Sequence, residues 1–484
     1  MSAVGFTPEP GDALPKGDGI GRGRVRRTAP FIRLSARTAG EAAVVGLRGK
    51  LTGADSSEFH IRTAERYTEL LGHSKGALMK AGQTLSLLST TPAVPVEFQP
   101  IYQAALARLR DEAPPMAPEL ARVVLEHELG RRTEDAFAEF GWEPLAAASI
   151  GQVHAARLHD GREVAVKIQY PGVANAIGAD LKNVQLLATL LSLLLSLYAR
   201  RLNADARDAA RDMSGRIVEE LDYRFEAANQ ARFAERYREH PFIHVPEVIG
   251  ELSTGRVLTQ DLVQGKSWGD ALTCKQELRD RWAEAIWRFV YGSYARFGAI
   301  NADLHPGNYV FHDDGSVSFL DFGCVQQVRH DQVDMGVAIL RECLRGDVLG
   351  TWRASVEIGY WRSSDPVTPE EVFAWWHESF RCLWDEQPFT ITPEYAASWI
   401  EHRFSSTGPS ANALRYLTMQ SDCIQWTRIE VALSSVLAEL HATNDWAAIV
   451  AEYQGHAPIT ALGKLDYAYF EGRDEHEVPS YSQA

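Results

Sequence analysis

The chain has 484 residues, of which 45% are hydrophobic and 23% are charged. This composition is ordinary for a globular protein, so it excludes the collagen-like, disordered and small disulfide-rich classes. The five cysteines are widely spaced and include no Cys-x-x-Cys pair, which argues against a structural zinc site, a metal cluster or a disulfide framework. This cysteine usage fits a reducing, cytoplasmic compartment best.

The net charge of −15 argues against a general role in nucleic-acid binding. Residues 1–50 differ from the rest, because they hold nine Lys or Arg but only four Asp or Glu. We expect residues 1–55 to form a flexible basic leader in solvent, with peripheral contact to anionic lipid as the alternative. The most apolar run, residues 184–198, has 15 residues and includes four polar ones, so it predicts a buried or interfacial helix rather than a membrane span.

The first half of the chain changes its periodicity once. Helical patterning runs from about residue 56 to 140, with breaks at Pro92 to Pro95 and at Pro114-Pro115. The period then becomes two, and strand-like runs over 153–158 and 163–168 are joined by Asp160-Gly161, a strong hairpin signal. A small β lobe is therefore expected behind a helical extension.

The second half of the chain is mainly helical. A long helical stretch is expected from about 175 to 237, followed by strand-like residues at 245–248 and 256–262. After Gly265 the pattern is helical again, apart from an irregular segment at 301–325 that holds strand-like pieces over 309–312 and 316–320. The fold class expected is α+β and predominantly α, with a small lobe followed by a larger one.

Three polar residues in the irregular segment have the spacing that phosphoryl transfer needs. Asp303 and Asn308 are five residues apart, and Asp321-Phe322-Gly323 follows after a predicted hairpin. A kinase-type site uses one carboxylate to orient the attacking hydroxyl, and an Asn with a second carboxylate to hold Mg²⁺. We therefore predict Asp303 as the catalytic base and Asn308 with Asp321 as the metal ligands.

A lysine upstream completes the pattern. Lys167 lies in the second predicted strand, on the opposite face from Val166, where a kinase places the lysine that binds the α- and β-phosphates. Such a lysine needs a helical Glu to orient it, and Glu226 is the candidate. Glu219, seven residues earlier on nearly the same helical face, is the rival.

Two features differ from a signalling protein kinase. Where a Gly-rich phosphate loop is expected, the chain has the stretch Ala146, Ala147, Ala148, Ser149, Ile150, Gly151 and Gln152, and alanine restricts the backbone more than glycine. After Gly323 there is no Ser, Thr or Tyr until Thr351, and no Ala-Pro-Glu motif. A phosphorylatable activation segment and a platform for a peptide substrate are therefore not expected.

These motifs resemble those of the UbiB/AarF-type atypical kinases, a family named for ubiquinone biosynthesis. The family's K-x-G-Q motif corresponds to Lys80, Gly82 and Gln83, and its E-x-D motif to Glu220 and Asp222. Its alanine-rich loop matches Ala146 to Ser149, and its D-x-H-P-G-N loop matches Asp303 to Asn308. Asn301 and Leu304 stand where the family usually has His and Pro, which predicts altered support for that loop.

The resemblance implies a protein-kinase-like two-lobed fold with an N-terminal helical extension. It also implies that ATP or ADP binds with Mg²⁺, and that Lys80 and Gln83 contact Glu220 and Asp222 over the active site. In that arrangement Glu226 pairs with Lys167. We expect the adenine to lie against a hinge near Gln260 and Leu262.

The expected function is an ATP- and Mg²⁺-dependent atypical kinase or ATPase, which acts on or is regulated by a small hydrophobic or quinone-related molecule. The alternatives are a small-molecule kinase of the aminoglycoside-phosphotransferase kind and a nucleotide-sensing scaffold without turnover. The expected domains are a leader (1–55), an extension (56–125), an N-lobe with a helical insertion (126–262), a C-lobe (263–470) and a tail (471–484).

Two further interpretations concern residues outside the main motifs. His305 is expected to support the catalytic loop rather than to act as a base, because Asp303 already has that position. Aromatic residues between Trp361 and Trp384 have roughly helical spacing, so we expect a buried core face rather than a box for a quinone or lipid.

Overall fold

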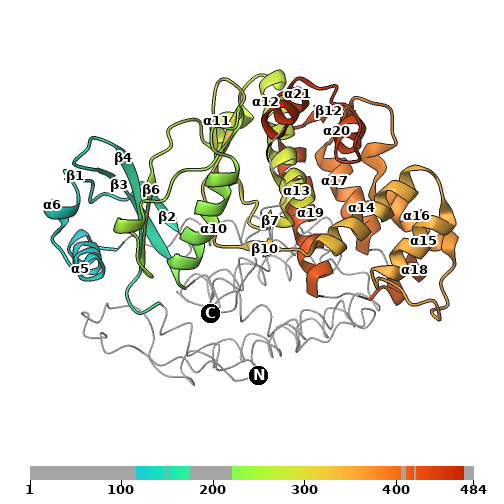
Figure 1. The fold of residues 1–484 in the computed structure, drawn as a ribbon, viewed down its shortest axis with the longest axis horizontal. Helices are drawn as coiled ribbons and strands as arrows, with labels where there is room; N and C mark the ends of the chain where they lie inside the picture. The colour runs from blue at the N-terminus through green and yellow to red at the C-terminus, as the bar shows by residue number, and fades with distance from the viewer. Residues whose placement is uncertain are drawn as a thin grey trace, which may run out of the picture.

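The computed structural model describes residues 116–148, 150–173, 221–404, 410–418, 421–471 and 473. Figure 1 shows a small lobe built on a sheet, a larger helical lobe, and α10 between them. The basic leader, the Lys80-x-Gly82-Gln83 motif, Ser149, the apolar run at 184–198, Glu219 and Glu220 lie outside the described residues.

The small lobe consists of one antiparallel sheet and the helices beside it. Its strands pair in the order β1-β3-β4-β6, and β2 pairs with β3. The elements are α5 (Pro118–Leu129), α6 (Thr133–Ala136), β1 (Glu139–Phe140), β2 (Ala146–Ala148), β3 (Gly151–Arg157), β4 (Glu163–Gln169) and β6 (Val257–Asp261). The predicted hairpin is confirmed as β3 and β4, with Val153 opposite Lys167.

Alternation along β4 separates the core from the site. Val164, Val166 and Ile168 are fully buried in a hydrophobic cluster with residues of α5. Lys167 therefore lies on the other face of the sheet, toward α10. The predicted helical patterning up to residue 140 is wrong at its end, because Glu139 and Phe140 pair with β3 as a strand.

The helix α10 (Tyr223–Arg236) joins the two lobes. Its N-cap is Asp222, whose side chain accepts a hydrogen bond from the Arg224 backbone N–H. Near its other end Phe233 enters the core of the larger lobe, with its ring centroid 5.1 Å from that of Phe322. The helix α10 therefore contacts both the small-lobe sheet and the Asp-Phe-Gly segment.

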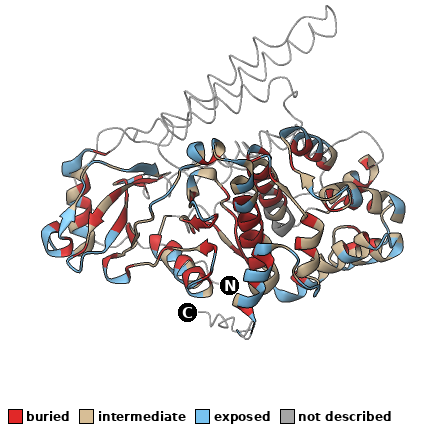
Figure 2. Cartoon of the chain, turned by 90° about the horizontal axis from the view of Figure 1, so that it is seen from above, coloured by how far each residue is buried: buried red, intermediate tan, exposed pale blue. Residues whose placement is uncertain are grey.

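The larger lobe is mainly helical, as the sequence predicts. Its helices are α11 (Trp268–Leu272), α12 (Gln276–Trp287), the π-helical turn η3 (Arg288–Gly292), α13 (Ser293–Phe297), α14 (His330–Leu344), α15 (Val348–Glu357), α16 (Pro369–Ser379), α17 (Pro393–Phe404), α18 (Ala411–Tyr416), α19 (Ser421–Glu439), α20 (Trp446–Glu452) and α21 (Ala461–Phe470). Short 3₁₀ turns lie at η2 (Gly250–Leu252), η4 (Pro306–Asn308) and η5 (Arg381–Leu383). Figure 2 shows buried residues concentrated on a helix in the middle of this lobe, with exposed residues toward the periphery.

Three short sheets complete the larger lobe. They are β7 (Ala299–Asn301) with β10 (Val325–Gln327), β5 (Ile243–His244) with β9 (Val317–Phe319) and β8 (Tyr309–Phe311), and β11 (Phe389–Thr390) with β12 (Thr443–Asn444). The strand-like pieces predicted around 309–312 and 316–320 are confirmed as β8 and β9. The strand predicted at 245–248 is wrong, because pairing stops at His244 and resumes only as a single bridge at Val248. Pro246 has no backbone N–H to donate to a ladder.

The aromatic residues of α16 form the core face that the sequence predicts. Trp361, Trp375 and Trp376 are buried together, and Phe380 and Trp384 pack against them. Within the described residues, no helix is both long and apolar enough to cross a membrane.

Candidate active site

The centre of the candidate site is an ion-pair cluster at the junction of the lobes. Lys167 Nζ donates to both carboxylate oxygens of Glu226, at 2.8 and 2.9 Å, and to Asp321 Oδ2 at 3.2 Å. The Lys167 and Glu226 side chains are only 15% and 6% exposed. The structure thus brings together a strand residue, a helix residue and a loop residue that are far apart in the sequence.

The electrostatics keep Lys167 charged. Burial alone would lower the pKa of Lys167, but the carboxylates of Asp321 and Glu226 outweigh it and raise that pKa well above its ordinary value. The ring of Tyr223 adds a cation–π contact, with its centroid 5.0 Å from Lys167 Nζ. Burial raises the pKa of the Tyr223 hydroxyl, so this ring stays neutral beside the ammonium group.

The loop that carries Asp303 and Asn308 follows β7 and is held by Asn301. The Asn301 side chain donates to the Asp321 carbonyl oxygen at 2.7 Å and accepts from the Asp303 backbone N–H at 3.0 Å. One buried amide therefore links the loop to the Asp-Phe-Gly segment. The sequence predicts altered support at Asn301, which stands in place of the family's His, and in this structure Asn301 bonds on both sides of the loop.

Hydrogen bonds to neighbouring backbone groups hold each of the proposed metal ligands, Asn308 and Asp321. The Asn308 side-chain nitrogen donates to the Asp303 carbonyl oxygen at 3.3 Å, and the Asn308 carbonyl oxygen accepts from the Leu320 N–H at 3.0 Å. Asp321 Oδ1 accepts from the Gly323 N–H at 2.9 Å, which fixes the orientation of this carboxylate. The Asn229 side chain of α10 donates to the Phe322 carbonyl oxygen at 3.1 Å and holds the same segment.

These donors fit a magnesium ion that is shared with phosphates. Mg²⁺ commonly takes only one or two protein ligands and completes its shell with phosphate oxygens and water. Because the Asn308 side-chain nitrogen donates to the Asp303 carbonyl oxygen, the amide oxygen is the atom of this side chain that would bind a metal. Among the described residues, no group of three or more His, Cys, Asp or Glu is placed to hold a metal ion.

His305 has a local role in the loop. Its Nδ1 accepts the backbone N–H of Gly307 at 3.0 Å and caps the 3₁₀ turn η4. This contact is the loop support that the sequence predicts for His305.

The alanine-rich stretch forms a hairpin edge above the site. Ala146, Ala147 and Ala148 make up β2 and pair with β3, so that Ala148 lies opposite Gly151. The side chain of Gln152 is buried and accepts from the Met116 N–H at 2.7 Å. Ile150 lies in the hydrophobic cluster of the small lobe. Both predicted nucleotide-binding side chains are therefore enclosed within the small lobe, and any contact of these two residues with a ligand would come from their backbone groups.

The remaining candidates lie at the edges of the site. Gln260 is in β6 opposite Ala165, and the Leu262 N–H donates to the Glu163 carbonyl oxygen at 3.0 Å, so both are at the end of the sheet where the lobes join. Asp222 caps α10 and pairs with Arg224 at 2.9 Å. Its predicted partners Lys80 and Gln83 lie outside the described residues.

Sequence reasoning missed two supporting residues, and for a third, Asn301, it predicted altered support of the loop but not the bonding partners. The two missed residues are Tyr223 against the lysine and Asn229 on the Phe322 carbonyl, while Asn301 lies between the two loops. Helical spacing contained a partial signal for Asn229, which is three residues after Glu226 and so shares its face. The other two contacts depend on long-range packing and have no local pattern.

The fold and the Lys-Glu-Asp cluster define the chain as a protein-kinase-like protein with two lobes. Comparison with known proteins gives the family. Residues 108–353 match the model of the ABC1 atypical kinase-like domain, which is half of the chain, so the chain belongs to this family. The predicted membership of the UbiB/AarF group is thereby confirmed.

Several relatives carry the same family description. The chain is 33% identical over 301 residues to "Atypical kinase COQ8B, mitochondrial" of Rattus norvegicus, which covers 62% of this chain and 55% of that protein. It is 30% identical over 298 residues to "Atypical kinase COQ8, mitochondrial" of Saccharomyces cerevisiae, covering 61% and 57%. The chain thus spans about half the length of these relatives. Both relatives are named as mitochondrial proteins, and the cytoplasmic location expected for this chain stays a prediction.

A solved structure supports the fold. The chain is similar to "The complex structure of Rv3197-erythromycin from Mycobacterium tuberculosis", with a TM-score of 0.58 and 29% sequence identity. The match covers 82% of this chain and 97% of that one. The similarity therefore extends over both lobes rather than over one motif.

Proposed function

We propose that this chain binds ATP or ADP with Mg²⁺ and acts as an atypical kinase or ATPase. Its acceptor or regulator would be a small hydrophobic or quinone-related molecule rather than a protein. The observation that carries the proposal is Lys167, which is held between Glu226 of α10 and Asp321 of the Asp-Phe-Gly segment. This is the geometry that a kinase needs to place a lysine on the α- and β-phosphates.

Each site residue then has a role. Lys167 would bind the α- and β-phosphates while Glu226 orients it, and Asp303 would orient an acceptor hydroxyl or a water molecule. Asp321 and Asn308 would hold Mg²⁺, which supplies charge neutralisation on the phosphates when it is bound. The backbone of the β2–β3 hairpin would cover the nucleotide, and residues at the end of β6 would contact the adenine.

The segment after the Asp-Phe-Gly motif supports a non-protein acceptor. Only six residues separate Gly323 from the start of α14, and three of them form β10. A long segment that could be phosphorylated and could align a peptide has no room in this connection. The sequence offers no hydroxyl side chain there either, since the first after Gly323 is Thr351.

The test is nucleotide-dependent stabilisation. Mg-ATP or Mg-ADP should raise the melting temperature of the wild-type protein, and Asp321→Asn should lose most of that shift because a ligand to the metal is removed. Asp331→Asn makes the same chemical change at an exposed ion pair on α14 and should keep the full shift. No shift for the wild type would refute nucleotide binding, and binding without phosphate release would indicate a sensing scaffold instead of an enzyme.

The K-x-G-Q motif gives a second test of the same function. If Lys80, Gly82 and Gln83 cover the site together with Glu220 and Asp222, Lys80→Ala should alter nucleotide preference or release activity. A kinase of the aminoglycoside-phosphotransferase kind has no such covering element, so there the change should leave activity unaffected or impaired. Phosphate release with and without detergent or a phenolic lipid mimic measures the difference.

A further inference from the structure

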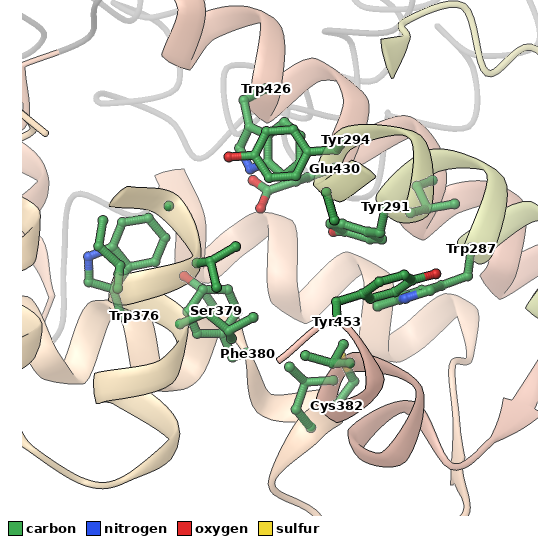
Figure 3. Close-up of a pocket in the computed structure, with 18 of the residues that line it drawn as sticks. Trp287, Tyr291, Tyr294, Trp376, Ser379, Phe380, Cys382, Trp426, Glu430 and Tyr453 are labelled. Atoms are coloured by element: carbon green, nitrogen blue, oxygen red, sulfur yellow. The ribbon is translucent and has the colours of Figure 1, made fainter. Parts of the chain in front are cut away.

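A cavity of about 200 Å³ lies among the helices of the larger lobe. Figure 3 shows the side chains of Trp376 and Phe380 on one side of it, those of Tyr291 and Trp287 on the other, and Glu430 above. None of the residues assigned above to the nucleotide or the metal lines this cavity. It is therefore a separate site.

The walls are mainly aromatic and are arranged as ring faces and edges. Trp376 stacks on Phe380 with ring centroids 5.4 Å apart, and the rings of Tyr294 and Trp426 are 4.7 Å apart. Aromatic walls of this kind favour a flat, apolar ligand that can stack or meet them edge to face. A smaller cavity of about 150 Å³ is enough to hold a benzene ring.

Four buried polar atoms of lining residues have no hydrogen-bond partner within the described part of the chain, namely Trp287 Nε1, Gln326 Oε1, the Tyr453 hydroxyl and Gln454 Nε2, and they point to the polar part of the ligand. Trp287 and Gln326 are 6% and 5% exposed. The indole N–H can only donate, and the amide oxygen can only accept. A ligand with one acceptor and one donor would satisfy the Trp287 and Gln326 atoms, and the Tyr453 hydroxyl and the Gln454 nitrogen offer further partners in the same lining.

The charges of the lining favour a neutral ligand. The lining residues that the structure describes include no Lys or Arg. Their carboxylate, Glu430, already accepts from Arg403 at 2.9 Å, so it is not available to balance a cation. An anion would meet Glu430 with no positive group facing it across the cavity.

The helix beside the cavity has an unusual turn at this place. The chain runs from α12 through the π-helical turn Arg288–Gly292 into α13, and Trp287, Tyr291 and Tyr294 from this helix all line the cavity. Such π turns are rare and occur frequently at functional sites. The turn therefore supports a binding role independently of the unpaired polar atoms.

We propose that this cavity binds a small neutral molecule that has an aromatic ring and carries a hydrogen-bond donor and a hydrogen-bond acceptor. The inference goes beyond the proposed function, because binding here needs no nucleotide. Gln326 lies in β10 opposite Ile300 of β7, so the ligand would contact the strand pair next to Asn301.

The test uses three probes with the same fused six- and five-membered ring framework on the whole 484-residue chain without nucleotide. Indazole has a ring N–H donor beside a ring nitrogen acceptor, indene has neither, and indazole-3-carboxylate adds a negative charge. By calorimetric titration we expect indazole to bind at least about fivefold more tightly than indene, since a hydrogen bond to a buried unpaired group distinguishes them. The carboxylate should show no measurable binding. Equal affinities of indazole and indene, or no binding of indazole up to its solubility limit, would overturn the proposal.

Variants then locate the binding. Ser434 on α19 lines the cavity and Ser435 does not, so Ser434→Leu should weaken indazole binding at least about tenfold while Ser435→Leu should leave it unchanged. Gln326→Leu should remove the preference of the protein for indazole over indene. An unchanged indazole affinity in a folded Ser434→Leu variant would place the binding elsewhere and refute the site. The Mg-ADP melting shift, measured on the same variants, reports separately on the nucleotide site.

Discussion

Lys167→Met tests whether the buried ion-pair cluster has the energetic weight that its geometry implies. The substitution keeps an apolar stem beside the Tyr223 ring but removes the ammonium group that lies 2.8 Å from Glu226 and 3.2 Å from Asp321. Two carboxylates are then left facing each other without a cation. Removing one partner of a buried ion pair costs roughly 3–5 kcal/mol, so the free energy of unfolding at pH 7 should fall by about that amount.

The pH dependence separates this cause from lost packing. Because the pKa of Lys167 is raised in the folded protein, its contribution is fully present below the unfolded-state value of about 10.5 and is lost only as the pH rises through the higher folded value. The difference between wild type and variant should therefore be constant from pH 7 to about pH 10. Below pH 7 it should shrink, because one of two carboxylates that share a site takes up a proton more readily.

Urea unfolding followed by far-UV circular dichroism at several pH values provides the measurement. Arg162→Met is the matched control, because Arg162 lies in the turn before β4 and forms an ion pair with Asp160 in which both side chains are about half exposed. We expect no measurable change for this control. A Lys167→Met variant within about 1 kcal/mol of wild type at pH 7, or a deficit that does not narrow at pH 5, would refute the electrostatic argument.

The remaining predictions concern the supports of the site. Gly151→Ala should destabilise the small lobe by about 1–3 kcal/mol, because the added methyl group would overlap the Ile168 carbonyl oxygen. Gly250→Ala should leave the stability unchanged, because a methyl group added at Gly250 would meet open space. The urea unfolding midpoints of the two variants measure the difference. Asn301→Ala leaves the Asp321 carbonyl and the Asp303 N–H without this partner and should lower stability by about 2 kcal/mol, with a matching loss of phosphate release. A fully stable and active Asn301→Ala variant would show that the amide is not the link between the two loops.

The parts of the fold that the sequence predicts well are those decided by local chemistry. Asp160-Gly161 determines the β3–β4 hairpin because a tight turn needs a residue at positive φ, and Gly161 has a φ of +92°. The Asp303 to Asn308 loop and Asp321 are visible because five-residue spacing and a hairpin are short-range features. The strand predicted at 245–248 failed where Pro246 interrupts pairing, which the pattern of apolar residues does not register.

The cavity illustrates what local patterns cannot predict. The interpretation of Trp376 and Phe380 as a core face is correct, since both pack in a buried cluster. The same two side chains also line a cavity whose other walls come from Trp287 and Trp426, about 90 residues before and 50 after Trp376 in the sequence. Periodicity can show that a face is buried, but only packing between distant segments determines whether the buried space is filled.

If the chain binds a nucleotide as proposed, the charge of the site predicts that binding requires magnesium. Lys167 contributes one positive charge, and its partners Glu226 and Asp321 contribute two negative ones, so the cluster opposes an anionic phosphate chain by itself. The chain as a whole has a net charge of −15 and supplies no general positive field to offset this. We therefore expect the stabilisation by ADP to disappear when EDTA replaces Mg²⁺, and to return when excess Mg²⁺ is restored. Because EDTA leaves the protein's own lysine in place, an ADP shift that persists in EDTA would mean that Lys167 alone overcomes both carboxylates, and the charge argument would be wrong.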